Sequence, residues 1–142
     1  MILPKPLWWI LSLTWGLTMT LAGFCVALVL MLLGYKPKRN LYGWYFEIGE
    51  DGWGGFNLGP ISLTCHYPTR RLLNHEFGHS VHNCYFGPLV WFIITLPSVI
   101  RYWYREYLVN CRGKKYSDLP AYDAIWFEGT ATEIGARYNE VL

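Results

Sequence analysis

Two histidines and a glutamate stand at a spacing that could hold a metal ion and use it. His75, Glu76 and His79 form the pattern HExxH. On an α-helix, residues four apart lie on one face, so both imidazoles can reach the same cation. A glutamate next to the first histidine can then take a proton from a water molecule at the cation, which is the arrangement of zinc peptidases. The pattern therefore predicts a Zn²⁺ site on a helix, with Glu76 as the catalytic base.

A catalytic zinc ion usually has three protein ligands and one open position, so a third ligand must come from elsewhere in the chain. We predict that this ligand is Glu128. A carboxylate has a short reach, so its helix must approach the HExxH helix closely, and small residues allow that. Glu133 and Asp123 are weaker candidates. The small residues that follow Glu128 are Gly129, Ala131, Gly135 and Ala136.

Peptide hydrolysis at such a site also needs a donor that stabilises the oxyanion. His82, Arg137 and Tyr138 are candidates for this catalytic role, and the sequence does not choose among them. His82 is a poor metal ligand beside His75 and His79. Ligands at i, i+4 and i+7 on a straight helix place the outer two about 10 Å apart along the axis. We interpret His82 as a group that supports the ligands or contacts the substrate.

The second half of the chain predicts three helices that position these residues. Thr69 can cap the HExxH helix, and Gly87-Pro88 can end it. Ser117 or Asp118 with Pro120 can open the last helix. The expected ranges are 69–86 for the HExxH helix, 88–108 for an apolar helix and 118–140 for the helix that carries Glu128.

Upstream of these helices, residues 42–64 predict a small β-hairpin. The segment is rich in aromatic residues, alternates in part between apolar and polar residues, and contains the turn residues Glu50-Asp51-Gly52. Pro60 suits an edge strand because it lacks an amide donor. An edge strand near Phe56–Leu63 could bind a substrate as an added strand.

The first part of the chain predicts a membrane segment. Residues 7–33 contain no charged side chain, and a helix of roughly 20 apolar residues crosses the hydrocarbon core of a bilayer. The stretch is too long for the core of a signal peptide, so we expect one retained transmembrane helix within residues 1–35. Lys36, Lys38 and Arg39 follow it, against Lys5 in front. The positive-inside rule then places the N-terminus outside and the rest on the cytoplasmic side.

Charges also constrain the HExxH helix and the apolar helix that follows. If the two form a hairpin that dips into the bilayer, with its tip near Gly87-Pro88, all flanking basic residues lie on one side. The alternative is that both helices lie on the membrane surface. Either arrangement gives a mainly α membrane protein with a transmembrane helix at 1–35 and a membrane-associated domain at 36–142. The flanking basic residues are Arg70, Arg71, Arg101, Arg105, Arg112, Lys114 and Lys115.

Composition agrees with a membrane location. Hydrophobic residues make up 53 % of the 142 residues and charged ones 15 %, and 8 Trp and 11 Tyr are present, which favour membrane–water interfaces. The net charge of +2 is too small to predict binding to nucleic acid. Cys25, Cys65, Cys84 and Cys111 form no CxxC pair and indicate a reducing compartment. The remaining apolar surface is compatible with a homo-oligomer.

HExxH with a glutamate on a later helix resembles the gluzincin type of zinc metallopeptidase. More narrowly, the chain resembles a group of small bacterial membrane proteins over residues 53–135. The resemblance implies His75, His79 and Glu128 as zinc ligands and Glu76 as catalytic base. Gluzincins often carry an acidic residue four positions after the ligand glutamate, where this chain has Thr132. The matching segments are Trp53-Gly54-Gly55-Phe56-Asn57-Leu58-Gly59, His75–His79, Gly87-Pro88-Leu89, Leu96-Pro97-Ser98 and Trp126-Phe127-Glu128.

We therefore expect a membrane-embedded zinc metallopeptidase in a bacterial plasma membrane. Its substrates would be membrane-anchored or membrane-adjacent polypeptides, with Glu76 activating a water molecule. The alternative is a non-catalytic membrane module in which zinc clamps helices together or partner proteins bind the hairpin. The two differ in coordination, because a clamp has a closed fourth position and an enzyme an open one.

Overall fold

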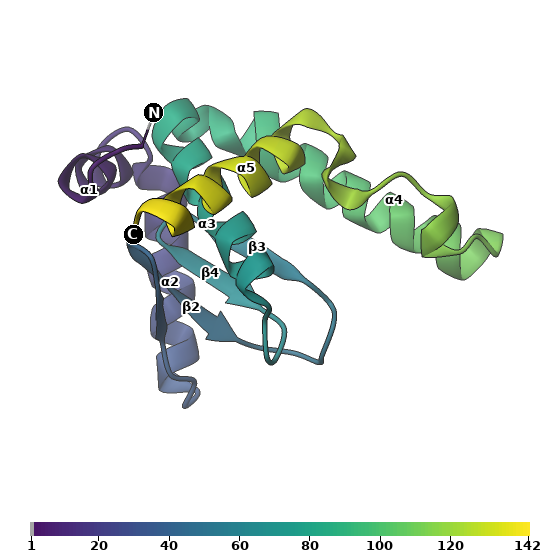
Figure 1. Cartoon of the computed structure of the whole chain (residues 1–142). Coiled ribbons are helices and arrows are strands. Elements are labelled where there is room, and N and C mark those ends of the chain that lie inside the picture. The colour runs from purple at the N-terminus through teal and green to yellow at the C-terminus, as the bar shows by residue number, and fades with distance from the viewer. Residues whose placement is uncertain (1) are drawn as a thin grey trace.

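The computed structural model describes residues 2–142, which form a mainly helical protein with one small sheet. Helix α3 lies between α5 and the sheet, and α4 leads away from this body (Figure 1). The helices are α1 (Lys5–Leu13), α2 (Leu17–Leu32), α3 (Arg70–Phe86), α4 (Leu96–Arg112) and α5 (Trp126–Val141). The strands are β1 (Lys38–Asn40), β2 (Gly43–Glu47), β3 (Gly55–Leu58) and β4 (Ile61–Thr64).

The sheet has the strand order β1-β2-β4-β3. The hairpin predicted over 42–64 is found only in part: β3 and β4 pair antiparallel on either side of Gly59-Pro60, whereas the predicted turn Glu50-Asp51-Gly52 connects β2 and β3, which do not pair. Strand β2 pairs with β4 in parallel, and β1 adds a fourth strand. The expectation that Pro60 lies on an edge strand is wrong. Pro60 occupies the turn, where its carbonyl accepts a hydrogen bond from the Trp44 amide at 3.0 Å, and the edge beyond β4 is β3.

The apolar stretch at the N-terminus forms two helices where one was predicted. Helix α1 ends at Leu13, and α2 begins at Leu17 with its axis turned by 92°. At the bend, the Thr14 hydroxyl and the Gly16 amide bind carbonyls of the preceding turn. Gly16 lies against Asn83 of α3. A Cβ added to Gly16 would come within 2.5 Å of the side-chain amide nitrogen of Asn83. Glycine therefore lets this bend pack directly on α3.

Helix length and direction bear on the predicted membrane span. Within residues 2–142, no helix taken singly combines the length and the apolar character that crossing a bilayer requires. Helices α1 and α2 meet both conditions together, and so do the segments Arg70–Leu89 and Trp91–Arg112, but these pairs are bent by 92° and 116°. Membrane location therefore stays a prediction.

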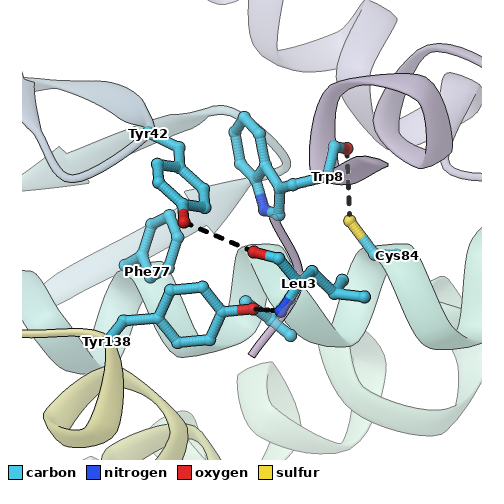
Figure 2. Close-up of a cluster of buried hydrophobic side chains, with 7 residues drawn as sticks. Leu3, Trp8, Tyr42, Phe77, Cys84 and Tyr138 are labelled. Carbon is cyan, nitrogen blue, oxygen red and sulfur yellow. Dashed lines mark hydrogen bonds between the residues drawn. The ribbon is translucent and has the colours of Figure 1, made fainter. Parts of the chain in front are cut away.

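The first residues of the chain share a core with α3 and α5. Leu3 and Trp8 are buried among Tyr42, Phe77 and Tyr138, as Figure 2 shows. The Tyr138 hydroxyl accepts a hydrogen bond from the Leu3 amide at 2.7 Å. Residues before and after position 35 thus pack together, and the N-terminal part is integral to the folded body.

Close packing of α3 against α5 follows from small residues, as the sequence predicts. A Cβ added to Gly78 of α3 would overlap the backbone carbonyl of Ala131 on α5. One added to Gly135 of α5 would overlap the carbonyl of Asn74 on α3. The two backbones therefore touch at two points, and side chains on their facing surfaces meet across a short gap.

Two expected helix boundaries differ from the structure. The predicted HExxH helix agrees with α3, which Thr69 caps by accepting the Leu72 amide. The apolar helix expected at 88–108 begins at Leu96, after a π-helical turn at Trp91–Thr95, and ends at Arg112. The last helix begins at Trp126, later than the expected position 118. The segment before it folds back on α4, where Arg101 and Arg105 donate to carbonyls of residues 120–122, and a 3₁₀ turn, Tyr122–Ala124, precedes α5.

Candidate metal centre

His75, His79 and Glu128 converge at one point between α3 and α5. Nε2 of His75 and Nε2 of His79 lie 3.2 Å apart. Oε2 of Glu128 lies 3.0 Å from the first nitrogen and 3.1 Å from the second. The histidines come from successive turns of α3, and Glu128 from the first turn of α5. The close approach of the two helices brings the carboxylate within reach, as expected from the small residues.

The donor set fits a divalent metal ion. Ligand atoms around a tetrahedral zinc ion, at about 2.0–2.1 Å from it, are separated by roughly 3.3 Å. The three edges measured here, 3.0–3.2 Å, approach that value. Three electron-rich atoms that face one another at this distance repel unless a proton or cation lies between them. His75, His79 and Glu128 therefore form a group that could hold a metal ion.

Thr132 orients the first histidine. Its Oγ1 lies 2.9 Å from Nδ1 of His75, and it donates to the Glu128 carbonyl at 3.2 Å. Because the hydroxyl proton is used on that carbonyl, the oxygen accepts a proton from Nδ1 and leaves the Nε2 lone pair directed at the metal group. Thr132 thus fixes the tautomer and the orientation of the His75 ring.

His82 lies behind His79, on the side away from its metal-facing nitrogen. Nδ1 of His82 is 3.4 Å from Nδ1 of His79, and its Nε2 is 3.0 Å from the hydroxyl of Thr130. Burial, reinforced by the nearby His79, lowers the pKa of His82 to about 3, so the ring is neutral. Of the two roles predicted for His82, support of a ligand agrees with this position, and contact with substrate does not.

Glu76 borders a large pocket that opens beside the ligands. The pocket has a volume of about 910 Å³ and includes both histidines, Glu76 and Glu128 in its wall. Burial raises the pKa of Glu76 above its ordinary value. The carboxylate abuts the edge strand β3, since a Cβ on Gly55 would come within 2.6 Å of its Oε1. Glycine at position 55 therefore leaves the space that the Glu76 side chain occupies.

The second carboxylate oxygen of Glu128 is held by residues that the sequence did not single out as site residues. Ser98 of α4 donates a hydrogen bond to Oε1, and the Tyr122 hydroxyl lies 3.3 Å from the Ser98 oxygen. Burial tends to raise the pKa of Glu128, but the adjacent imidazoles of His75 and His79 and the hydrogen bond from Ser98 lower the pKa below its ordinary value. Glu128 is therefore ionised, as a metal ligand must be.

Tyr122 lies in the wall of the pocket and is fixed from several sides. Guanidinium groups of Arg101 and Arg105 lie 5.9 Å and 5.6 Å from the centre of its ring. The neighbouring Asp123 pairs with Arg71 of α3 at 2.9 Å. No motif in the sequence marks Tyr122 as a site residue. It reaches the pocket because the segment before α5 packs back against α4.

The other predicted residues lie elsewhere. Tyr138, predicted as a catalytic residue, is buried in the core of Figure 2 with its hydroxyl bonded to Leu3, and it is not part of the pocket wall. Its spacing from Glu128 places it near the far end of α5. Arg137 and Glu133 are exposed on α5, and Asp123 is engaged by Arg71. Among the acidic candidates for third ligand, Glu128 alone joins the histidines in the described residues.

Comparisons of the chain with models of protein families, with curated proteins and with solved structures find no match.

Proposed function

We propose that the protein is a membrane-bound zinc metallopeptidase that hydrolyses peptide bonds in membrane-anchored or membrane-adjacent polypeptides. The observation that supports this most is the joint placement of Glu76 and the ligand group on one pocket wall. Two imidazoles and one carboxylate are a ligand set typical of catalytic zinc. A zinc ion held there would polarise the scissile carbonyl and lower the pKa of a water molecule.

In this proposal, Glu76 moves the protons. Its carboxylate takes a proton from the attacking water and later donates it to the leaving amine. A pKa raised by burial makes Glu76 a stronger base than an exposed glutamate. The carboxylate occupies space that a side chain at position 55 would fill, so Gly55 keeps room for Glu76 beside the pocket.

The free edge of β3 supports binding of an extended peptide. Gly55, Phe56 and Asn57 line the pocket, and β3 pairs with β4 on its other side. An unpaired strand edge offers backbone donors and acceptors to a peptide that adds as a further strand. The pocket wall includes residues of β3 and, from the segment after α4, Tyr116 and Tyr122.

Tyr122 is the best placed donor for the oxyanion. Its hydroxyl lies on the pocket wall beside Ser98, close to the ligand Glu128. Burial raises the pKa of Tyr122 to about 12, so the phenol keeps its proton at neutral and alkaline pH. Because Ser98 donates to Glu128, the phenol proton is directed at Ser98 in this structure, and Tyr122 would turn it toward the developing negative charge. Tyr122 thus replaces His82, Arg137 and Tyr138 in the proposed mechanism.

The open pocket also favours a peptidase over the alternative of a zinc clamp, because a clamp surrounds its metal with protein ligands. The test uses zinc-loaded protein and a library of quenched fluorescent peptides. Glu76→Gln should keep its zinc and lose at least about a hundredfold in turnover. Tyr122→Phe should lower kcat and leave the metal bound. Unchanged turnover in Glu76→Gln would refute the role of base, and a zinc-loaded wild type that cleaves nothing would favour the clamp.

A further inference from the structure

Two helices of this protein carry an apolar stripe on the side that faces away from the protein. On α2 the exposed stripe consists of Leu17, Leu21, Phe24 and Leu28. On α4 and the turn before it, the exposed stripe consists of Phe92, Leu96, Ile100, Trp103 and Tyr107. Spacings of three and four residues place each set on a single helix face. Both stripes are substantial, with Leu28 of α2 57 % exposed and Trp103 of α4 66 % exposed.

The inner face of α4 is more polar than its outer face. Ser98, Arg101 and Arg105 point toward the returning segment and the site, where they bind Glu128 and backbone carbonyls. A helix in water normally has the opposite arrangement, with its apolar face turned inward. The outer face of α4 therefore indicates an apolar surrounding.

The two stripes begin at one junction. Trp15, in the bend between α1 and α2, donates from its indole to the Tyr85 carbonyl at 3.2 Å. Trp91, at the start of the turn before α4, donates to the Thr18 hydroxyl at 3.1 Å. From this junction α2 runs along the sheet and α4 runs away from it (Figure 1). Two helix axes that diverge from one point can both lie along one flat surface.

Each stripe ends in a group of three exposed basic residues. Lys36, Lys38 and Arg39 follow α2, and Arg112, Lys114 and Lys115 follow the stripe of α4. Lys38 is paired with Glu47 at 2.7 Å, and Arg39 lies 5.2 Å from the centre of the Trp44 ring. Between Lys5 and Lys36 the sequence contains no charged side chain. Exposed apolar helix faces that end in basic groups bind membranes that contain anionic lipids.

We propose that α2 and α4 dock together, in the plane of the interface, on an anionic lipid bilayer. The stripes lie at the boundary between headgroups and acyl chains, and the basic ends contact the headgroups. A second copy of the chain is a poorer occupant, since the basic groups at the ends of its stripes would meet others of the same sign. This docking differs from a transmembrane span, and it does not depend on zinc or on catalysis.

The first test measures binding of the full chain to vesicles of phosphatidylcholine with and without phosphatidylglycerol. Wild type should bind the anionic vesicles more tightly, and added salt should weaken that binding. Two double variants each place two glutamates in one stripe, and each should lower the partition coefficient about tenfold or more. They are Leu21→Glu/Leu28→Glu in α2 and Ile100→Glu/Trp103→Glu in α4. Tyr67→Glu is the control, because Tyr67 is 86 % exposed on the loop before α3. Stripe variants that bind like wild type, or an effect from one stripe alone, would overturn the proposal.

The second test needs no change to the stripes. Cys25 of α2 and Cys111 of α4 are exposed, whereas Cys65 and Cys84 are buried. Anionic vesicles should protect both exposed thiols from a water-soluble maleimide. A fluorophore on Cys25 should be quenched more by labels near the headgroups than by labels at the acyl-chain ends. Stronger quenching by labels at the acyl-chain ends would show that α2 spans the bilayer. Thiols that are protected without vesicles, in a protein that is dimeric, would show that a second copy covers the stripes. Either result would overturn interfacial docking.

Glu76→Gln separates this proposal from the proposed function. That variant should bind vesicles as wild type does, whatever its effect on peptide turnover. Lost vesicle binding in Glu76→Gln would mean that the site and the docking surface are not independent, contrary to the proposal.

Discussion

At the scale of single residues, the histidines and the glutamate of the HExxH helix face three different surroundings. His75 and His79 direct Nε2 at Glu128, and Glu76 faces the pocket beside them. His82 lies one layer further from the pocket, against His79 and Thr130. A helix fixes these directions at a spacing of three and four residues, which is why HExxH could be interpreted from sequence alone.

Thr132 should matter for metal affinity because it accepts the Nδ1 proton of His75. Thr132→Val keeps the shape and removes the acceptor, so His75 loses its fixed tautomer and orientation. We expect metal affinity to fall about 10- to 100-fold, measured by competition with a chromogenic chelator. Thr132→Ser should retain most of the affinity. A valine variant that binds metal as tightly as wild type would contradict this role.

Tyr138 should matter for stability and not for chemistry. Tyr138→Phe leaves the buried Leu3 amide without its acceptor at 2.7 Å. An unsatisfied buried donor costs about 1–3 kcal/mol of unfolding free energy. Denaturant unfolding should show that loss, while kcat at saturating substrate and full metal occupancy stays close to wild type. A large fall in kcat with unchanged stability would restore Tyr138 as a catalytic candidate.

At the scale of elements, the site depends on how closely α3 and α5 approach. Gly78 and Gly135 remove the side chains that would hold the two backbones apart. The small residues around Glu128 predicted this approach. The sequence did not predict that α5 starts at Trp126, because the hydrogen bonds from Arg101 and Arg105 to residues 120–122 join segments 15 to 20 positions apart.

Gly135→Ala should weaken both the fold and the metal site. The new methyl group would overlap the Asn74 backbone carbonyl, which cannot move without moving α3. Overpacking of this kind costs about 1–3 kcal/mol, and the shift would also carry Glu128 away from the histidines. Thermal unfolding and metal titration should both respond. Ala136→Leu, on the exposed side of the same helix, is the control and should change neither.

At the scale of the whole molecule, the N-terminal part is not a detachable anchor. Its apolar composition predicted a helix, but composition does not reveal that Trp8 and Leu3 are buried against α3 and α5. The bend at Thr14–Gly16 likewise depends on a contact with Asn83, far away in the sequence. Periodicity and composition predict elements, whereas the sheet order and these long-range contacts depend on packing that no local pattern encodes.

Trp8→Ala should therefore destabilise the entire protein and not only its first helix. Trp8 is fully buried beside Phe77 and Tyr42. Truncation of a buried tryptophan to alanine costs about 3–5 kcal/mol. Hydrogen exchange should show that the free energy of opening of the α3 amides falls by the same amount. Exchange in α3 that is unchanged by the substitution would indicate that the N-terminal residues fold separately.

The most direct measurement for the whole account is the metal content of purified protein. We expect about one zinc per chain in wild type and in Glu76→Gln, and a small fraction of that in His79→Ala and Glu128→Ala. His66→Ala is the control, because His66 is exposed on the loop after β4 and should leave the metal content unchanged. Equal metal content in wild type, His79→Ala and Glu128→Ala, whether high or negligible, would contradict the assignment of these residues as ligands.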